Sequence, residues 1–177
     1  MLTQVVSGGQ TGVDQAGLDA AIDLGIPHGG WCPLGRLSEN GKIPKKYLLQ
    51  ETDSPKYTVR TRLNVKESDG TLILFEASMS RGTGLTANHA GRLGRPLLTI
   101  DIVEFLEWGE ARFEEELQKA NDWIEEHEIK VLNIAGPRES TSPGIGGIAN
   151  MFLSKLFELQ LAARGNRSPT RKRGITA

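Results

Sequence analysis

Short apolar runs alternate with longer helical patterns along this chain, and the alternation restricts the folds that it can adopt. The apolar runs lie at residues 5–6, 26–32, 71–75, 96–100 and 131–135. The helical patterns lie at residues 16–24, 57–68, 85–93, 102–126 and 145–163. Strands that alternate with helices indicate βαβ units, whose strands are parallel. The sequence therefore predicts a layered α/β fold with a mostly parallel central sheet, in which residues 71–75 form a strand buried on both faces.

The length of the chain predicts one domain followed by a short tail. A chain of 177 residues has the size of one ordinary domain, which we place at residues 1–163. Residues 164–177 contain five arginines or lysines and no acidic residue, and we expect this basic tail to be disordered. The polar segment 33–55 is too long for a simple connector, so it predicts a lid or a binding loop.

Charge and cysteine content exclude several classes of protein. The formal net charge of the chain is −1, so residues 1–163 without the basic tail carry about −6, which argues against specific nucleic-acid binding. No apolar run is long enough to span a membrane, and no signal-peptide pattern is visible. The single cysteine, Cys32, excludes an internal disulfide and fits a reducing compartment. We therefore expect a cytoplasmic protein with no membrane partner.

The first glycine-rich loop, Ser-Gly-Gly-Gln-Thr-Gly-Val-Asp at residues 7–14, has the pattern of an anion-binding turn. It leads from an apolar run directly into a helical pattern, and the unpaired N–H groups at a helix start favour anions. It is not a P-loop, because Val13 stands where that motif needs a lysine, and it lacks the G-x-G-x-x-G spacing of dinucleotide-binding loops. The alternative interpretation is an ordinary strand-to-helix turn in which Asp14 starts the helix.

Two further turns follow predicted strands and carry the same kinds of groups. Residues 78–86 combine glycines and hydroxyls with Arg81, and residues 136–144 include Arg138, whose guanidinium can pair bidentately with a phosphate. The carboxyl ends of parallel strands meet at one sheet edge, so we expect the three turns to form a pocket for a phosphorylated small molecule. The candidate ligand-binding residues are Gly8, Gly9, Gln10, Thr11, Gly12, Asp14, Trp31, Arg36, Arg81, Gly82, Thr83, Gly84, Thr86, Gly136, Arg138 and Ser140.

Trp31 and Arg36 belong to this set because an indole and a guanidinium can hold a flat ring by stacking. The alternative is that Trp31 packs on the sheet while Arg36 makes a surface ion pair. Cys32 and His28 are too few ligands for a structural zinc site, so we predict no metal site. The spacing supports no Ser-His-Asp or Cys-His arrangement.

Motifs along the chain resemble, in the same order, those of the putative molybdenum carrier family. They are SGGQTGVD at 7–14, GWCPLGR at 30–36 with ENG at 39–41 and IP at 43–44, RTRLNV at 60–65, SDGTLI at 68–73, GTGLT at 82–86 and GPRES at 136–140. That family is similar to a circularly permuted, YpsA-like branch of the Rossmann-like superfamily, which includes cytokinin-activating phosphoribohydrolases and DprA-type domains. The resemblance implies a Rossmann-like three-layer sandwich in which residues 131–140 correspond to the opening segment of unpermuted relatives.

The resemblance also implies a ligand, which is a nucleotide-like molecule or the molybdenum cofactor of the family name, and it favours a homo-oligomer. The phosphoribohydrolases carry a glutamate shortly after their glycine motif, whereas Thr86 and Asn88 stand there in this chain. The leading hypothesis is therefore a carrier that binds a phosphorylated ligand without consuming it. One alternative is an N-glycosidase that acts on a nucleoside monophosphate with Asp14 or Glu139 as its catalytic carboxylate. The other is a nucleotide-sensing module.

Overall fold

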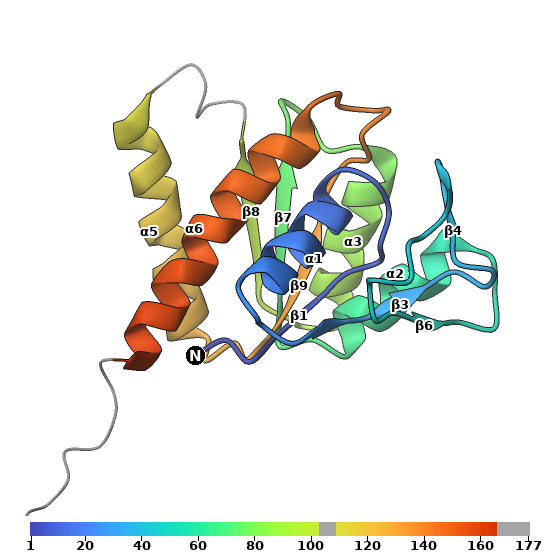
Figure 1. The fold of residues 1–177 in the computed structure, drawn as a ribbon, viewed down its shortest axis with the longest axis horizontal. Coiled ribbons are helices and arrows are strands. Elements are labelled where there is room, and N and C mark those ends of the chain that lie inside the picture. The colour runs from blue at the N-terminus through green and yellow to red at the C-terminus, as the bar shows by residue number, and fades with distance from the viewer. Residues whose placement is uncertain (103–108, 166–177) are drawn as a thin grey trace, which may run out of the picture.

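The computed structural model describes residues 1–102 and 109–165, and its centre is a parallel β-sheet (Figure 1). The strands are β1 (Gln4–Val6), β2 (His28–Gly29), β7 (Gly70–Phe75), β8 (Leu97–Asp101) and β9 (Val131–Ala135). Their order is β2-β1-β9-β7-β8, and every neighbouring pair is parallel. The last strand of the sequence thus lies between β1 and β7 in the middle of the sheet.

Helices cover both faces of this sheet. They are α1 (Val13–Asp23), α2 (Tyr57–Lys66), α3 (Arg81–Arg92), α5 (Glu110–Glu126) and α6 (Ile145–Gly165). α1 and α6 pack against each other on one face, α5 packs beside α6, and α3 covers the other face with α2 packed against it (Figure 1). The predicted α/β, Rossmann-like three-layer sandwich is therefore confirmed.

The positions of two inner strands, β7 and β9, follow from their sequences. Residues 70–74 of β7 are buried without alternation, as expected for a strand that pairs on both sides with β8 and β9. Asn133 of β9 is buried, and its side-chain amide donates to the Thr71 hydroxyl at 3.2 Å. On the α1 side, Gly17 lets the helix approach closely, because a Cβ there would lie 2.9 Å from the Ile134 side chain.

The polar segment 33–55, predicted as a lid or binding loop, contains short strands and forms a folded layer with Trp31 and Cys32. The predicted strand at 26–32 is divided at Gly30 (φ +116°), so β2 stays in the central sheet while β3 (Trp31–Cys32) pairs with β6 (Gln50–Glu51). A hairpin of β4 (Leu37–Ser38) and β5 (Gly41–Lys42) extends from the layer. Cys32, Ile43, Tyr47 and Leu49 of this layer pack with Leu18 of α1 and form a small second core.

Three helix starts differ from the sequence prediction, and the first is that of α1, which begins at Val13, three residues before the predicted pattern. α5 begins at Glu110 after Gly109 (φ +79°), so the expected continuous helix over 102–126 is wrong at its start. The predicted apolar residues Phe105, Leu106 and Trp108 lie outside the described residues. α3 begins at Arg81, four residues before the predicted start, because Ser80 supplies an N-cap.

The last helix extends two residues beyond its predicted end at residue 163. α6 extends to Gly165, so Arg164 and Gly165 belong to the helix, and residues 166–177 of the predicted tail lie outside the described residues. Within the part of the chain that the structure describes, none of the helices has the length and apolarity needed to cross a membrane.

Candidate functional site

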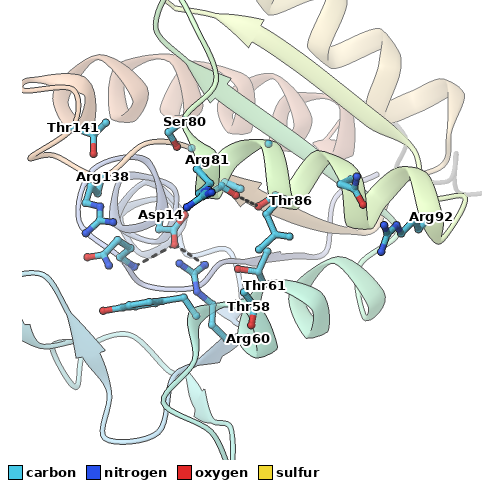
Figure 2. Close-up of a pocket in the computed structure, with 18 residues that line it drawn as sticks. Asp14, Thr58, Arg60, Thr61, Ser80, Arg81, Thr86, Arg92, Arg138 and Thr141 are labelled. Carbon is cyan, nitrogen blue, oxygen red and sulfur yellow. Dashed lines mark hydrogen bonds and ion pairs between the residues drawn. The ribbon is translucent and has the colours of Figure 1, made fainter.

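A cavity of about 880 Å³ opens at the carboxyl ends of β1, β7 and β9, between α2 and α3 (Figure 2). Its position matches the rule that open parallel sheets bind ligands where the strand order reverses. The lining residues are Gln10, Asp14, Tyr57, Thr58, Arg60, Thr61, Ser80, Arg81, Gly82, Gly84, Leu85, Thr86, Asn88, Arg92, Ala135, Gly136, Arg138 and Thr141. The three predicted turns therefore do meet at one edge of the sheet.

The lining of this cavity is strongly cationic. The described lining residues include four arginines, Arg60, Arg81, Arg92 and Arg138, and a single carboxylate, that of Asp14. Figure 2 shows Arg60, Arg81 and Arg138 grouped around Asp14, with Arg92 farther along α3. Arg81 and Arg92 are eleven residues apart on one helix, which corresponds to about 16 Å along its axis. The cavity is thus suited to an anionic ligand, with positive charge at both of its ends.

A buried ion pair forms the floor of the cavity. The Arg60 Nη1 atom lies 3.0 Å from Asp14 Oδ2, and the two side chains are 14% and 4% exposed. The Gln10 backbone N–H donates to the same oxygen at 3.2 Å. Gly8 lies directly against this pair, since a Cβ at Gly8 would be 1.7 Å from Arg60 Nη1. The first glycine of the predicted phosphate loop therefore makes room for an arginine of α2.

Burial raises the pKa of Asp14 above its ordinary value of 3.8, while Arg60 and the Gln10 N–H offset part of that rise. A raised pKa means that folding favours the protonated carboxyl, so its contribution to stability is complete below pH 3.8. That contribution is lost as the pH rises through the raised pKa of the folded state.

We therefore expect the wild-type protein to lose stability relative to the Asp14→Asn variant as the pH rises from about 4 upward. Urea unfolding of both proteins across this range measures the difference. Arg60 is common to the two proteins, so the pH-dependent part of the difference reports on Asp14. A wild-type protein that gained stability over the variant with rising pH would show that the pKa of Asp14 is lowered instead.

The N-terminus of α3 offers backbone donors to the same cavity. Ser80 caps the helix, because its Oγ accepts from the Thr83 N–H at 3.2 Å and its carbonyl accepts from the Gly84 N–H at 2.8 Å. Gly82 and Gly84 line the cavity. A Cβ at Gly82 would meet Ser80 Oγ at 3.9 Å, and one at Gly84 would meet none of the described atoms within 4 Å. Without side chains these glycines leave the helix start accessible, where N–H groups and the helix dipole favour an anion.

The loop at residues 7–14 satisfies much of its own hydrogen bonding. The Thr11 N–H donates to the Gln10 side-chain oxygen at 3.1 Å, and the Val13 N–H donates to the Pro137 carbonyl at 3.2 Å. Gly12 (φ +75°) packs against the third turn, since a Cβ there would lie 2.5 Å from the Pro137 carbonyl oxygen. Within this loop, all of which the structure describes, Gln10 and Asp14 line the cavity and the other residues do not.

Glu139, one of the two candidate catalytic carboxylates, is engaged elsewhere. It accepts hydrogen bonds from the backbone N–H groups of Gly144 and Gly146 at the start of α6. A carboxylate at this position compensates the positive end of the helix dipole. Glu139 is not a lining residue, so the structure assigns it a capping role, and Asp14 is the candidate carboxylate that faces the cavity.

Trp31 and Arg36 also lie outside the cavity lining. The Trp31 indole N–H donates to Glu67 at 2.7 Å, so the ring packs toward α2. Among the described residues, Arg36 makes neither the predicted ring stack nor the alternative surface ion pair. Its guanidinium donates to the backbone carbonyls of Ile43, Pro44, Tyr47 and Leu49. It holds together the layer formed by residues 33–55.

The predicted set therefore separates into two groups. Lining the cavity are Gln10, Asp14, Arg81, Gly82, Gly84, Thr86, Gly136 and Arg138. Outside the lining are Gly8, Gly9, Thr11, Gly12, Trp31, Arg36, Thr83 and Ser140. The most important residue missed by the prediction is Arg60, together with the Tyr57, Thr58 and Thr61 side chains of α2. No local pattern marks a helical arginine as a site residue, because its partner Asp14 is distant in the sequence.

The sheet, its permuted strand order and the arginine-lined cavity at the strand ends define a Rossmann-like protein with a site suited to anions. The chain belongs to the circularly permuted YpsA SLOG family, whose model matches residues 5–157. It is similar to the crystal structure of a "putative molybdenum carrier protein" from Syntrophus aciditrophicus SB. The identity is 41%, the match covers 90% of this chain and 95% of that one, and the TM-score is 0.81. No match was found among the curated proteins.

Proposed function

We propose that the chain binds a phosphorylated small molecule in the arginine-lined cavity and releases it unchanged. The observation that supports this most strongly is the charge of the described lining, which contains four guanidinium groups and one carboxylate. Asp14 is already paired with Arg60, and Arg138 lies 3.7 Å from Glu39, which is outside the lining, so Arg81 and Arg92 are the guanidinium groups that leave a net demand for negative charge. Phosphate groups satisfy guanidinium donors and helix N-termini together.

The molybdenum cofactor is one candidate cargo, because the similar crystal structure carries the name of a molybdenum carrier. The lining fits a cofactor held through its phosphate and a ring edge, with hydroxyls from Thr58 and Thr61 and the Tyr57 side chain available. The described lining contains no thiolate or imidazole, and within residues 1–102 and 109–165 no cluster of three His, Cys, Asp or Glu side chains is placed to hold a metal. A nucleotide is the other candidate, since it presents the same phosphate chemistry.

An N-glycosidase is the second candidate function, and the position of Asp14 is what favours it. Its carboxylate faces the cavity, and burial raises its pKa, as in many catalytic acids. Release of free base from a panel of nucleoside monophosphates, abolished in Asp14→Asn, would favour this activity. A protein that binds AMP and leaves it intact would favour the carrier.

We expect Arg81→Ala to weaken the binding of ADP by about tenfold, the usual cost of losing one charge-assisted contact at an exposed position. Isothermal titration with ADP measures this directly. The matched control is Arg62→Ala, since Arg62 is exposed on α2 and does not line the cavity. Equal affinities for wild type and Arg81→Ala would place the ligand elsewhere, and equal losses in both variants would indicate a non-specific charge effect.

A further inference from the structure

The Glu39 carboxylate lies in a cradle of hydrogen-bond donors at the tip of the β4–β5 hairpin. It accepts hydrogen bonds from the Thr11 hydroxyl, from the Ser140 hydroxyl and, at 3.2 Å, from the Ser140 backbone N–H. Arg138 Nη1 lies 3.7 Å from Glu39 Oε2. The Glu39 side chain is 12% exposed, so these donors have largely replaced water around the carboxylate.

This donor set is of the kind that proteins use to bind oxyanions. Two hydroxyls, one backbone N–H and one guanidinium converge from the turns that follow β1 and β9, and such groups bind phosphate as readily as carboxylate. Arg138 also lines the cavity, and Thr141 and Gln10 beside the cradle do so too. The cradle is therefore continuous with the proposed ligand site, and its present occupant is an anion from the same chain.

Glu39 is charged in this position. Burial alone would raise its pKa, but the hydrogen bonds from Ser140 and Thr11 and the charge of Arg138 together bring the pKa below the usual value of 4.5. An ionised carboxylate and a phosphate cannot use the same donors at once, because like charges at such short range repel strongly. Any phosphate that reaches the Arg138 end of the cavity must compete with Glu39.

The hairpin that carries Glu39 makes few other contacts with the rest of the described chain. Leu37, Asn40, Gly41 and Lys42 are exposed, and the Glu39 backbone N–H adds one more bond, to the Gln10 side chain at 3.0 Å. The residues after the hairpin are fixed separately, by Arg36 and the second core. Release of Glu39 would therefore expose little buried apolar surface, which is typical of segments that open locally.

We propose that Thr11, Arg138 and Ser140 form an oxyanion subsite at the edge of the cavity, and that Glu39 occupies it until the phosphate of a ligand displaces the carboxylate and frees the hairpin. The inference rests on the proposed function, because it requires an anionic ligand in the cavity. It gives Thr11 and Ser140, which lie outside the cavity lining, a direct role in binding. The bound phosphate takes over the donors, and the Glu39 carboxylate moves into water with its charge unchanged.

Inorganic phosphate is the probe that tests this competition, and its affinity is measured for wild type, Glu39→Ala and the double variant Glu39→Ala/Arg138→Ala. We expect Glu39→Ala to bind phosphate about tenfold more tightly than wild type, and the double variant to lose that gain. Glu51→Ala is the matched control, since it removes an exposed carboxylate of the same layer that accepts only from the Gly35 N–H among the contacts described. A Glu39→Ala protein that is folded and binds phosphate no better than wild type would overturn the proposal.

Hydrogen exchange on the wild-type protein gives an independent reading that does not depend on how well the variant folds. Amides 37–42 should exchange faster when phosphate is added, while those of β7 stay protected. Unchanged exchange at saturating phosphate would also overturn the proposal. If ADP binding depends on Arg81 and Glu39→Ala leaves the phosphate affinity unchanged, only the subsite proposal fails. If neither ADP nor phosphate binds to any of the proteins, the proposed function fails as well.

Discussion

Replacing Gly12 by alanine is expected to lower the free energy of unfolding by about 4 kcal/mol, through backbone strain and overpacking together. Gly12 has φ +75° and ψ −129°, a region that L-residues rarely adopt. A Cβ there would also lie 2.5 Å from the Pro137 carbonyl oxygen and 2.9 Å from the Glu139 nitrogen. Both neighbours are backbone atoms, so the turn after β9 would have to move as a whole. Urea denaturation measures the loss.

The matched control for this prediction is Gly25→Ala. Gly25 also has a positive φ, +66°, but a Cβ there would meet none of the described atoms within 4 Å. Its replacement places an L-residue in the left-handed region without a clash, so we expect a loss of about 1 kcal/mol from backbone strain alone. Equal losses at the two positions would show that the close packing of the 7–14 loop against the turn after β9 does not restrict which residue position 12 can hold.

Removal of the Arg60 side chain should be the most damaging change to the site itself. Arg60→Ala leaves the buried Asp14 carboxylate without its guanidinium, and the loss of one partner of a buried pair costs about 3 kcal/mol of stability. It also removes a guanidinium from the floor of the cavity, so ADP affinity should fall by more than tenfold, a larger loss than for Arg81→Ala. Thermal unfolding and isothermal titration measure the two effects separately.

The double variant Asp14→Asn/Arg60→Ala separates these two effects. Neutralising Asp14 removes the uncompensated charge, so the double variant should recover a large part of the lost stability, while the loss of ADP affinity persists. Arg62→Ala, on the exposed side of the same helix, should change neither quantity. An Arg60→Ala protein as stable as wild type would mean that the Asp14–Arg60 pair contributes little to the fold.

The strands of the central sheet could be predicted because their signal is local, whereas β4, β5 and β6 lie in a segment predicted as a loop. β7 and β9 are short, continuous apolar segments, and burial on both faces requires that pattern. The extent of two elements could not be predicted in the same way. Gly30 (φ +116°) divides the apolar run at 26–32 between two sheets, and Gly109 sets the start of α5 inside an apolar pattern that looked continuous.

The candidate site was predictable in its location but only partly in its members. Three polar turns after three parallel strands must meet at one edge, and Asp14, Arg81 and Arg138 do meet there. A glycine-rich sequence, however, does not reveal whether its glycines admit a ligand or another part of the protein. The absence of a side chain at Gly8 leaves room for Arg60, and its absence at Gly12 leaves room for the Pro137 backbone. Such roles depend on contacts between distant residues, which no local motif encodes.

Native mass spectrometry of the protein with ADP, inorganic phosphate and molybdate, each added separately, tests most directly whether the arginine-lined cavity is a binding site for phosphorylated molecules. We predict a complex with one ADP per chain, released intact on denaturation and lost in Arg60→Ala. The protein purified without any addition is measured alongside, so that a copurified ligand is detected by its mass. A native mass equal to that of the bare chain under every condition would contradict the assignment of this cavity as a ligand site.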